Sequence, residues 1–398
     1  MAIPRLLAYD GPAILSYGFR PFFLLGAVYS ACAAVVWLPV LYGEVALTTA
    51  FSPRDWHVHE MLYGFLPAVM TGFLLTAVPN WTGRLPLQGL PLGALVLLWI
   101  CGRVAVTVSG LIGWALAAAV DAAFLVVLVI LIVREIVTGK NWRNLRLVGI
   151  VAIFAAGNVA FHLESHLRGF ADYSTRMGLG AVVMLLVLVG GRVIPSFTHN
   201  WLARHGSNRL PAPFGWFDGL TIVATLIAAL VFVTAPMSVA VSAVFIGTGV
   251  LHIVRLVRWN GHRTFREPLV LVLHVGYAFI PLGFVLLGLA TFSVVPQSAG
   301  IHAWTAGAVG VMTLAMMTRA SLGHAGHKLV ASAGTQLIYL CAVVGALARI
   351  GAAMMPAWSM PLLHLSVVAW SAAFLGFAIV YGPLLLRPRQ TAGETAAV

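Results

Sequence analysis

The stretch WHVHEM (56–61) runs directly into the apolar segment LYGFLPAVMTGFLLTAV (62–78). Two histidines and a glutamate thus stand at the entrance of a run long enough to contribute a membrane span. Ionisable side chains are costly in hydrocarbon, so those kept at a membrane span usually have a function. Neutral imidazole is also a common ligand of haem iron, copper and zinc. The stretch therefore predicts a membrane protein that binds a metal.

The composition of the whole chain supports a membrane location. Of 398 residues, 61% are hydrophobic and 9% are charged, whereas about 25% are charged in an ordinary soluble domain. Continuous apolar runs argue against a membrane β-barrel, whose segments alternate in polarity. We predict an all-α, polytopic membrane helix bundle of about twelve transmembrane helices. The predicted spans are, approximately, 21–42, 58–78, 88–108, 111–133, 147–166, 177–197, 217–234, 237–257, 268–291, 299–318, 331–354 and 362–386.

The connections between spans are short, which predicts one transmembrane domain over 1–390 and a disordered polar tail over 391–398. Basic residues gather in the even-numbered loops, such as Arg134 in the fourth and Arg255 in the eighth. By the positive-inside rule these are solvated cytoplasmic loops, so both termini are predicted to be cytoplasmic. The same loops explain the net charge of +12 without a nucleic-acid partner. A bacterial inner membrane is the predicted location of this multi-pass protein.

The histidine spacing suggests several ligand sets. His57 and His59 are two residues apart, so on a helix their rings point about 200° apart and do not easily hold one metal ion. They serve two centres, or one is a ligand while the other hydrogen-bonds a carboxylate or substrate. His162 and His166, at i and i+4, share one helix face and suit a single ion. The alternative for that pair is a polar helix end that faces water.

Helix ten supplies further candidates. His302 begins the tenth span at the predicted depth of His57 and His59, so a haem held between helices two and ten is our preferred axial-ligand hypothesis. His324, flanked by glycine, and His274 lie at a comparable depth on the other side. A second metal site near these two residues is a further hypothesis.

Charged residues inside the spans have candidate roles beside such centres. Glu60, one turn into a helix and next to two histidines, is the preferred proton relay; Asp121 and Glu164 are alternatives. Arg103 and Arg349 are candidate partners of haem propionates, because guanidinium groups match carboxylates. Arg192 and Arg319 are candidates too, but snorkelling to the interface explains them as well.

Several motifs together resemble the NnrS family over nearly the whole chain. They are SYGFRPFF (16–23), WHVHEMLYGF (56–65), GFLLTAVPNWTGR (72–84), GGRVIPSFT (190–198), HVGY (274–277) and the segment 302–326. The resemblance implies a bacterial inner-membrane protein with haem and copper, associated with nitric oxide metabolism and nitrosative stress. Its motif histidines correspond here to His57, His59, His274, His302 and His324. The use of helices two and ten is also similar to haem–copper oxidases, although adjacent copper-ligand histidines in the middle helices are missing here.

The resemblance gives the functional expectation. We expect one or more haem b groups and copper, and nitric oxide as the small-molecule substrate or ligand, with Glu60 and His59 as catalytic residues. Reduction of two NO to N₂O by an oxidoreductase is the leading hypothesis, with membrane lipid around the protein and an electron donor that the sequence does not identify. The alternatives are a non-catalytic protein that binds NO or handles metal, and a transporter. No pair of broken helices at matching positions in two halves of the sequence supports the transporter.

Overall fold

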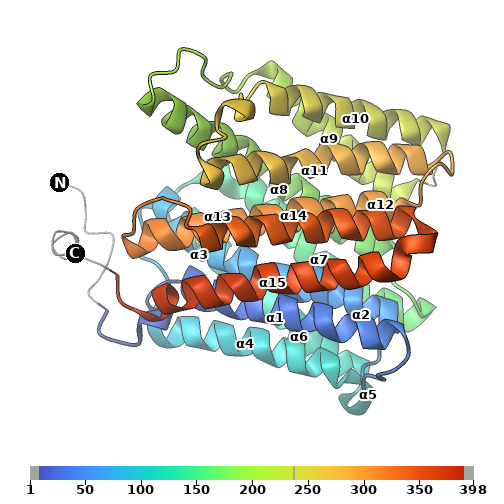
Figure 1. Cartoon of the computed structure of the whole chain (residues 1–398). Helices are drawn as coiled ribbons and strands as arrows, with labels where there is room; N and C mark the ends of the chain where they lie inside the picture. The colour runs from blue at the N-terminus through green and yellow to red at the C-terminus, as the bar shows by residue number, and fades with distance from the viewer. Residues whose placement is uncertain (1–8, 236–237, 390–398) are drawn as a thin grey trace. The chain divides into compact units, whose positions relative to one another are not determined.

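The computed structural model describes residues 9–235 and 238–389. This part of the chain is helical and contains no β-strand (Figure 1). Within it, twelve helices are long and apolar enough to cross a membrane. The prediction of an all-α polytopic membrane protein is therefore confirmed, whereas the cytoplasmic placement of the termini stays a prediction.

The helices follow one another through short connections. The α-helices are α1 (Phe19–Leu41), α2 (Pro53–His59), α3 (Leu66–Thr82), α4 (Gly89–Thr107), α5 (Ser109–Ile112), α6 (Trp114–Thr138), α7 (Leu145–Arg168), α8 (Tyr173–Arg204), α9 (Trp216–Thr234), α10 (Val239–Val257), α11 (Pro268–Ala290), α12 (Gln297–His302), α13 (Gly310–Ala325), α14 (Ala333–Met354) and α15 (Ser359–Leu386). Two π-helical segments, η2 (Glu60–Phe65) and η5 (Ala303–Val309), join α2 to α3 and α12 to α13. Short 3-10 turns are η1 (Ala13–Leu15), η3 (Trp142–Asn144), η4 (Gly261–Arg263) and η6 (Pro356–Trp358).

The second span begins earlier than its hydropathy indicates. It starts at Pro53 rather than near residue 58. The Ser52 hydroxyl accepts a hydrogen bond from the Asp55 amide at 3.2 Å, and proline occupies the first helical position. Both features favour a helix start whatever the polarity of the residues that follow. This capped start places the polar stretch around His57 and His59 on a helix.

The described chain divides into two compact units. Unit 1 lies within Met1–Gly178, Met317–Lys328 and Phe377–Val398, and unit 2 within Leu179–Met316 and Leu329–Gly376. The single domain predicted over 1–390 thus contains two compact units. The tail predicted over 391–398 lies outside the described residues.

Small residues bring the helices of unit 1 close together. A Cβ atom on Gly72 in α3 would lie 2.7 Å from the Phe23 ring of α1, so only glycine permits this approach. A Cβ atom on Gly102 in α4 would likewise lie 3.1 Å from Oδ1 of Asp121 in α6. Close packing at small residues is typical of membrane helices. Here it brings the carboxylate of α6 against α4, where Arg103 is found.

Candidate metal centre

His57 and His59 face different neighbours, as their spacing predicts. His57 is half-buried, and its ring stacks on Trp37 with centroids 4.3 Å apart. His59, the last residue of α2, is completely buried. Its ring is within contact distance of the His162 ring of α7, at 4.8 Å between centroids. The two histidines of the opening motif therefore belong to different surroundings.

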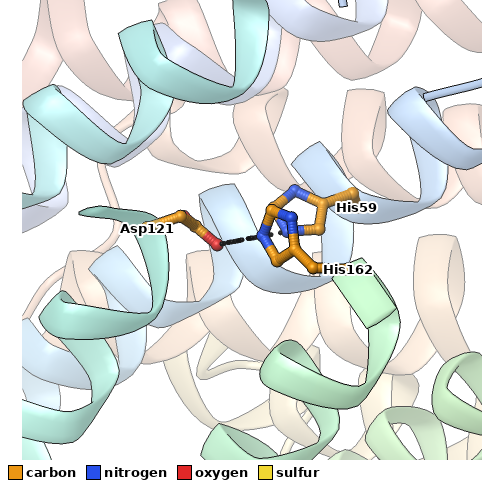
Figure 2. Close-up of side chains that lie close together, drawn as sticks. All are labelled: His59, Asp121 and His162. Carbon is orange, nitrogen blue, oxygen red and sulfur yellow. Dashed lines mark hydrogen bonds and ion pairs between the residues drawn. The ribbon is translucent and has the colours of Figure 1, made fainter. Parts of the chain in front are cut away.

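Three buried side chains from separate helices converge in unit 1. His59 from α2, Asp121 from α6 and His162 from α7 present ligand atoms that all lie within 4.8 Å of one another (Figure 2). Oδ2 of Asp121 is 3.0 Å from Nε2 of His162 and 3.2 Å from Nε2 of His59. We call these residues the His59–Asp121–His162 cluster.

A second carboxylate lies directly behind the cluster. Glu60, the first residue of η2, accepts a hydrogen bond from Nδ1 of His59 at 2.8 Å. Arg103 donates to both Glu60 carboxylate oxygens, at 2.7 and 2.8 Å, and also to Asp121. The Tyr29 hydroxyl donates to Glu60 as well. Arg103 thus ties the two carboxylates together, and Glu60 orients the His59 ring.

The hydrogen bonds around His59 place its Nε2 atom next to acceptor oxygens. Asn158 of α7 donates through Nδ2 to Oδ2 of Asp121 at 2.8 Å, which turns its Oδ1 towards Nε2 of His59 at 2.9 Å. Because the Glu60 carboxylate accepts the Nδ1 proton in a hydrogen bond, a neutral His59 ring carries its lone pair on Nε2. That lone pair faces the oxygens of Asn158 and Asp121. The lone pair and these oxygens repel each other. A cation on Nε2, either a second proton or a metal ion, removes this repulsion.

The buried charges also favour one further proton or cation in the cluster. Glu60 is 0%, Asp121 2% and Arg103 6% exposed. Two carboxylates and one guanidinium leave one net negative charge, and an uncompensated buried charge is strongly unfavourable. One additional positive charge, from a protonated histidine or a metal ion, balances the buried group, and so does a proton on Glu60.

The donor geometry fits a metal ion. Bonds of about 2.0–2.1 Å to nitrogen place neighbouring ligand atoms of one ion roughly 3.0–3.4 Å apart. The oxygen–nitrogen distances of 3.0 and 3.2 Å within the cluster lie in this range. A metal-binding histidine also commonly donates its other ring N–H to a carboxylate, as Nδ1 of His59 does to Glu60. The His59–Asp121–His162 cluster could therefore hold a metal ion.

A π-helical turn and a glycine make room for the arginine. Trp99 of α4 donates to the Gly64 carbonyl of η2 at 2.9 Å. A Cβ atom on Gly64 would overlap Nη1 of Arg103 and lie 3.0 Å from Oε2 of Glu60. Such π-helical turns are frequent at functional sites. Here the turn opens the space through which Arg103 reaches Glu60.

We expect the substitution Gly64→Ala to displace Arg103 and weaken metal binding about 10- to 100-fold, the usual effect of disturbing groups that support a ligand. Copper titration of the purified protein measures the change. Gly149→Ala in α7 is the matched control, because a Cβ atom there would meet nothing within 4 Å. Equal affinities in the two variants would contradict the positioning role of Gly64.

An aromatic side chain covers the two imidazoles. Phe51 is half-buried, and its ring lies 5.0 Å from the His59 ring and 5.1 Å from the His162 ring. It also packs edge-on against Phe161 at 5.4 Å. The cluster is therefore lined by aromatic rings on this side, which lowers its exposure to water.

The other predicted ligands of unit 1 lie in different surroundings. His166 is exposed and stacks on Trp114 at 4.1 Å, so His162 meets His59 in place of its predicted partner His166. His324 lies against the rings of Tyr17 and Phe19, at 5.8 and 5.6 Å. Both His166 and His324 make aromatic contacts in the described structure, and their role as ligands stays a prediction.

The predicted ligands of unit 2 lie on α11, α12 and α14. His274 is buried, with Nε2 2.8 Å from the Thr198 hydroxyl oxygen. His302, the last residue of α12, has Nδ1 2.6 Å from the Ser298 carbonyl oxygen. Arg349 of α14 is half-buried. Their assignment to haem or copper also stays a prediction.

A buried polar network in unit 2 is not predicted by the sequence. Arg255 donates to Asp218 at 2.8 Å and to the Tyr277 hydroxyl at 3.0 Å. The ring of His252 lies between the hydroxyls of Tyr277 and Thr225, each 2.9 Å away. The prediction that Arg255 belongs to a solvated loop is wrong, because it lies in α10 and is buried. It compensates the buried charge of Asp218.

A family model described as NnrS protein matches residues 13–389. The chain belongs to the NnrS family. The NnrS match includes every residue of the His59–Asp121–His162 cluster and the groups that support it. No curated protein matches the chain. With twelve apolar helices in its described part, this NnrS chain is a multi-pass membrane protein, and the particular membrane stays a prediction.

Proposed function

We propose that this NnrS-family protein holds a redox metal ion, copper, in the His59–Asp121–His162 cluster and uses it to reduce nitric oxide. The observation that carries the proposal is the buried cluster itself, whose ligand atoms converge and whose net negative charge favours a bound cation. Imidazole and carboxylate ligands without sulfur suit copper(II), and equally non-haem iron(II). Copper is preferred because the family resemblance implies it.

Haem b is the second proposed cofactor. Nδ1 of His302 donates to the Ser298 carbonyl at 2.6 Å, which leaves the lone pair of the neutral ring on Nε2, as a haem ligand requires. His57 is the alternative axial ligand. Both ring nitrogens of His59 face groups of the cluster, so we assign His59 to the metal ion. Arg103 is engaged by two carboxylates, which makes Arg349 the better partner for a haem propionate.

The proposed reaction consumes two NO, two electrons and two protons and yields N₂O and water. The metal ion, when bound, would supply a Lewis acid and a one-electron centre at which NO binds. Glu60 is suited to relay a proton to this site, because its carboxylate contacts Nδ1 of His59 and the Tyr29 hydroxyl. Arg103 stabilises negative charge on Glu60 and Asp121. The electrons come from an external donor, and the protein is proposed to reside in a bacterial inner membrane.

The aromatic cover supports a second candidate function. Phe51 lies over both imidazoles, and metal sites closed to substrate are more often structural than catalytic. On this view the protein binds NO or handles metal without turnover. A transporter has no comparable feature of the described structure in its favour.

Anaerobic turnover separates these functions. Purified protein with its metals is incubated with NO and a chemical reductant, and N₂O is measured by gas chromatography. We expect N₂O formation that falls at least about 100-fold in the variant His162→Ala, because a metal ligand is lost. Leu163→Ala, at an exposed position of the same helix, is the matched control and should retain activity. NO that is bound without N₂O formation would reject the reductase and leave the binding protein.

A further inference from the structure

A cavity of about 490 Å³ opens at the end of unit 1 where α3 and α6 finish. Its walls come from the last turns of α3, from the loop that leads to α4 and from the second half of α6. The cavity is well separated from the metal cluster along α6. Asp121 precedes Leu131, the first α6 residue that lines the cavity, by a stretch of helix about 15 Å long.

The mouth of the cavity is charged. Glu135 is bound by two arginines: Arg84 donates through Nε, and Arg134 donates through Nη2 at 2.8 Å. The exposed side-chain fractions are 38% for Arg84, 61% for Arg134 and 17% for Glu135. Two guanidiniums against one carboxylate leave one net positive charge. Since Arg84 uses Nε for Glu135, its terminal nitrogens can donate to an outside anion.

The interior of the cavity is apolar. Its lining includes Leu75 and Val78 of α3, Leu131 and Ile132 of α6, and Leu85 on the loop side. A ligand that fits must therefore place an anionic group at the mouth and a hydrocarbon chain inside. Basic pockets between membrane helices commonly bind anionic lipid headgroups in this way.

We infer that this cavity binds an anionic phospholipid. The phosphate lies on Arg84 and Arg134, and one acyl chain lies between Leu75 and Val78 of α3 and Leu131 of α6. The inference is independent of the proposed function, because the cavity shares no residue with the metal cluster.

Lipid exchange on the purified full-length protein in detergent tests the inference. Phosphatidylglycerol and phosphatidylcholine with the same acyl chains are added separately, and retained lipid is measured by native mass spectrometry. We expect phosphatidylglycerol to be retained preferentially. Arg134→Gln should lower that retention roughly fivefold, and Arg84→Gln with Arg134→Gln roughly 25-fold, from about 1 kcal/mol per arginine. Arg143→Gln with Arg146→Gln is the control for charge, because both residues are exposed and outside the cavity.

A second variant tests the interior without changing charge. Leu131→Trp fills the apolar part of the cavity and should release phosphatidylglycerol, whereas the control Leu97→Trp, at an exposed position of α4, should retain it. Inorganic phosphate is the probe for a site that binds an anion but has no space for an acyl chain. Three outcomes would each overturn the inference. They are equal retention of the two lipids, an equal loss in the charge control, and a rise in unfolding temperature with inorganic phosphate as large as with phosphatidylglycerol.

Discussion

Asp121→Asn is expected to lower the copper affinity of the purified protein at least about 100-fold while the metal-free protein stays folded. Disturbing a group that only supports a ligand costs about 10- to 100-fold in affinity, and Asp121 is proposed as a ligand itself. Asparagine keeps the shape and an oxygen, but it removes the negative charge. The remaining Glu60 and Arg103 then balance each other, so the cluster no longer requires a cation.

This variant separates a metal site from a cluster held by a protonated histidine. In the second case Asp121 pairs with a buried imidazolium, so its loss should lower the unfolding free energy and leave copper binding unchanged. Copper titration and thermal unfolding of metal-free protein in detergent measure the two quantities. Asp172→Asn is the control, since that carboxylate pairs with Arg54 and is 35% exposed. Unchanged copper binding in Asp121→Asn with a large loss of stability would refute the metal site.

The sequence predicts the fold well because the bilayer imposes one length on every span. Hydropathy locates all twelve helices of the described chain. It misplaces ends where capping decides them, as at Pro53, where Ser52 starts a helix of polar residues. The count of basic residues also assigns Arg255 to a loop, because its buried ion pair with Asp218 is a tertiary contact that the sequence pattern does not show.

The candidate site is predicted only in part. Hydrophobicity and motif point to His59 and Glu60, and the i, i+4 pattern points to His162. The pattern names His166 as its partner, because one helix alone cannot reveal which other helix packs against it. Asn158 is missed, although it lies one helical turn before His162 and therefore shares its face. The sequence indicates Asp121 only as an alternative proton relay. Its contact with His162 joins two residues that are far apart in the sequence, so no local pattern reveals it.

Arg103→Gln is expected to be the most destabilising change in unit 1. It leaves Glu60 and Asp121 buried without their shared counter-charge, and breaking a buried pair by removing one partner costs about 3–5 kcal/mol. The purified variant should unfold at a lower temperature in detergent and give a lower yield of folded protein. Arg103→Lys keeps the charge but loses the planar fork that contacts both carboxylates, so an intermediate loss is expected.

Charge balance makes this prediction specific. If the loss in Arg103→Gln comes from uncompensated carboxylates, adding Glu60→Gln removes one of them and should restore part of the stability. A double-mutant cycle then gives a coupling free energy of about 1–3 kcal/mol between Arg103 and Glu60. Purely steric damage predicts additive losses instead, because a neutral side chain at position 60 repairs no packing at position 103. Additivity in the cycle would therefore refute the charge argument on which the metal site also depends.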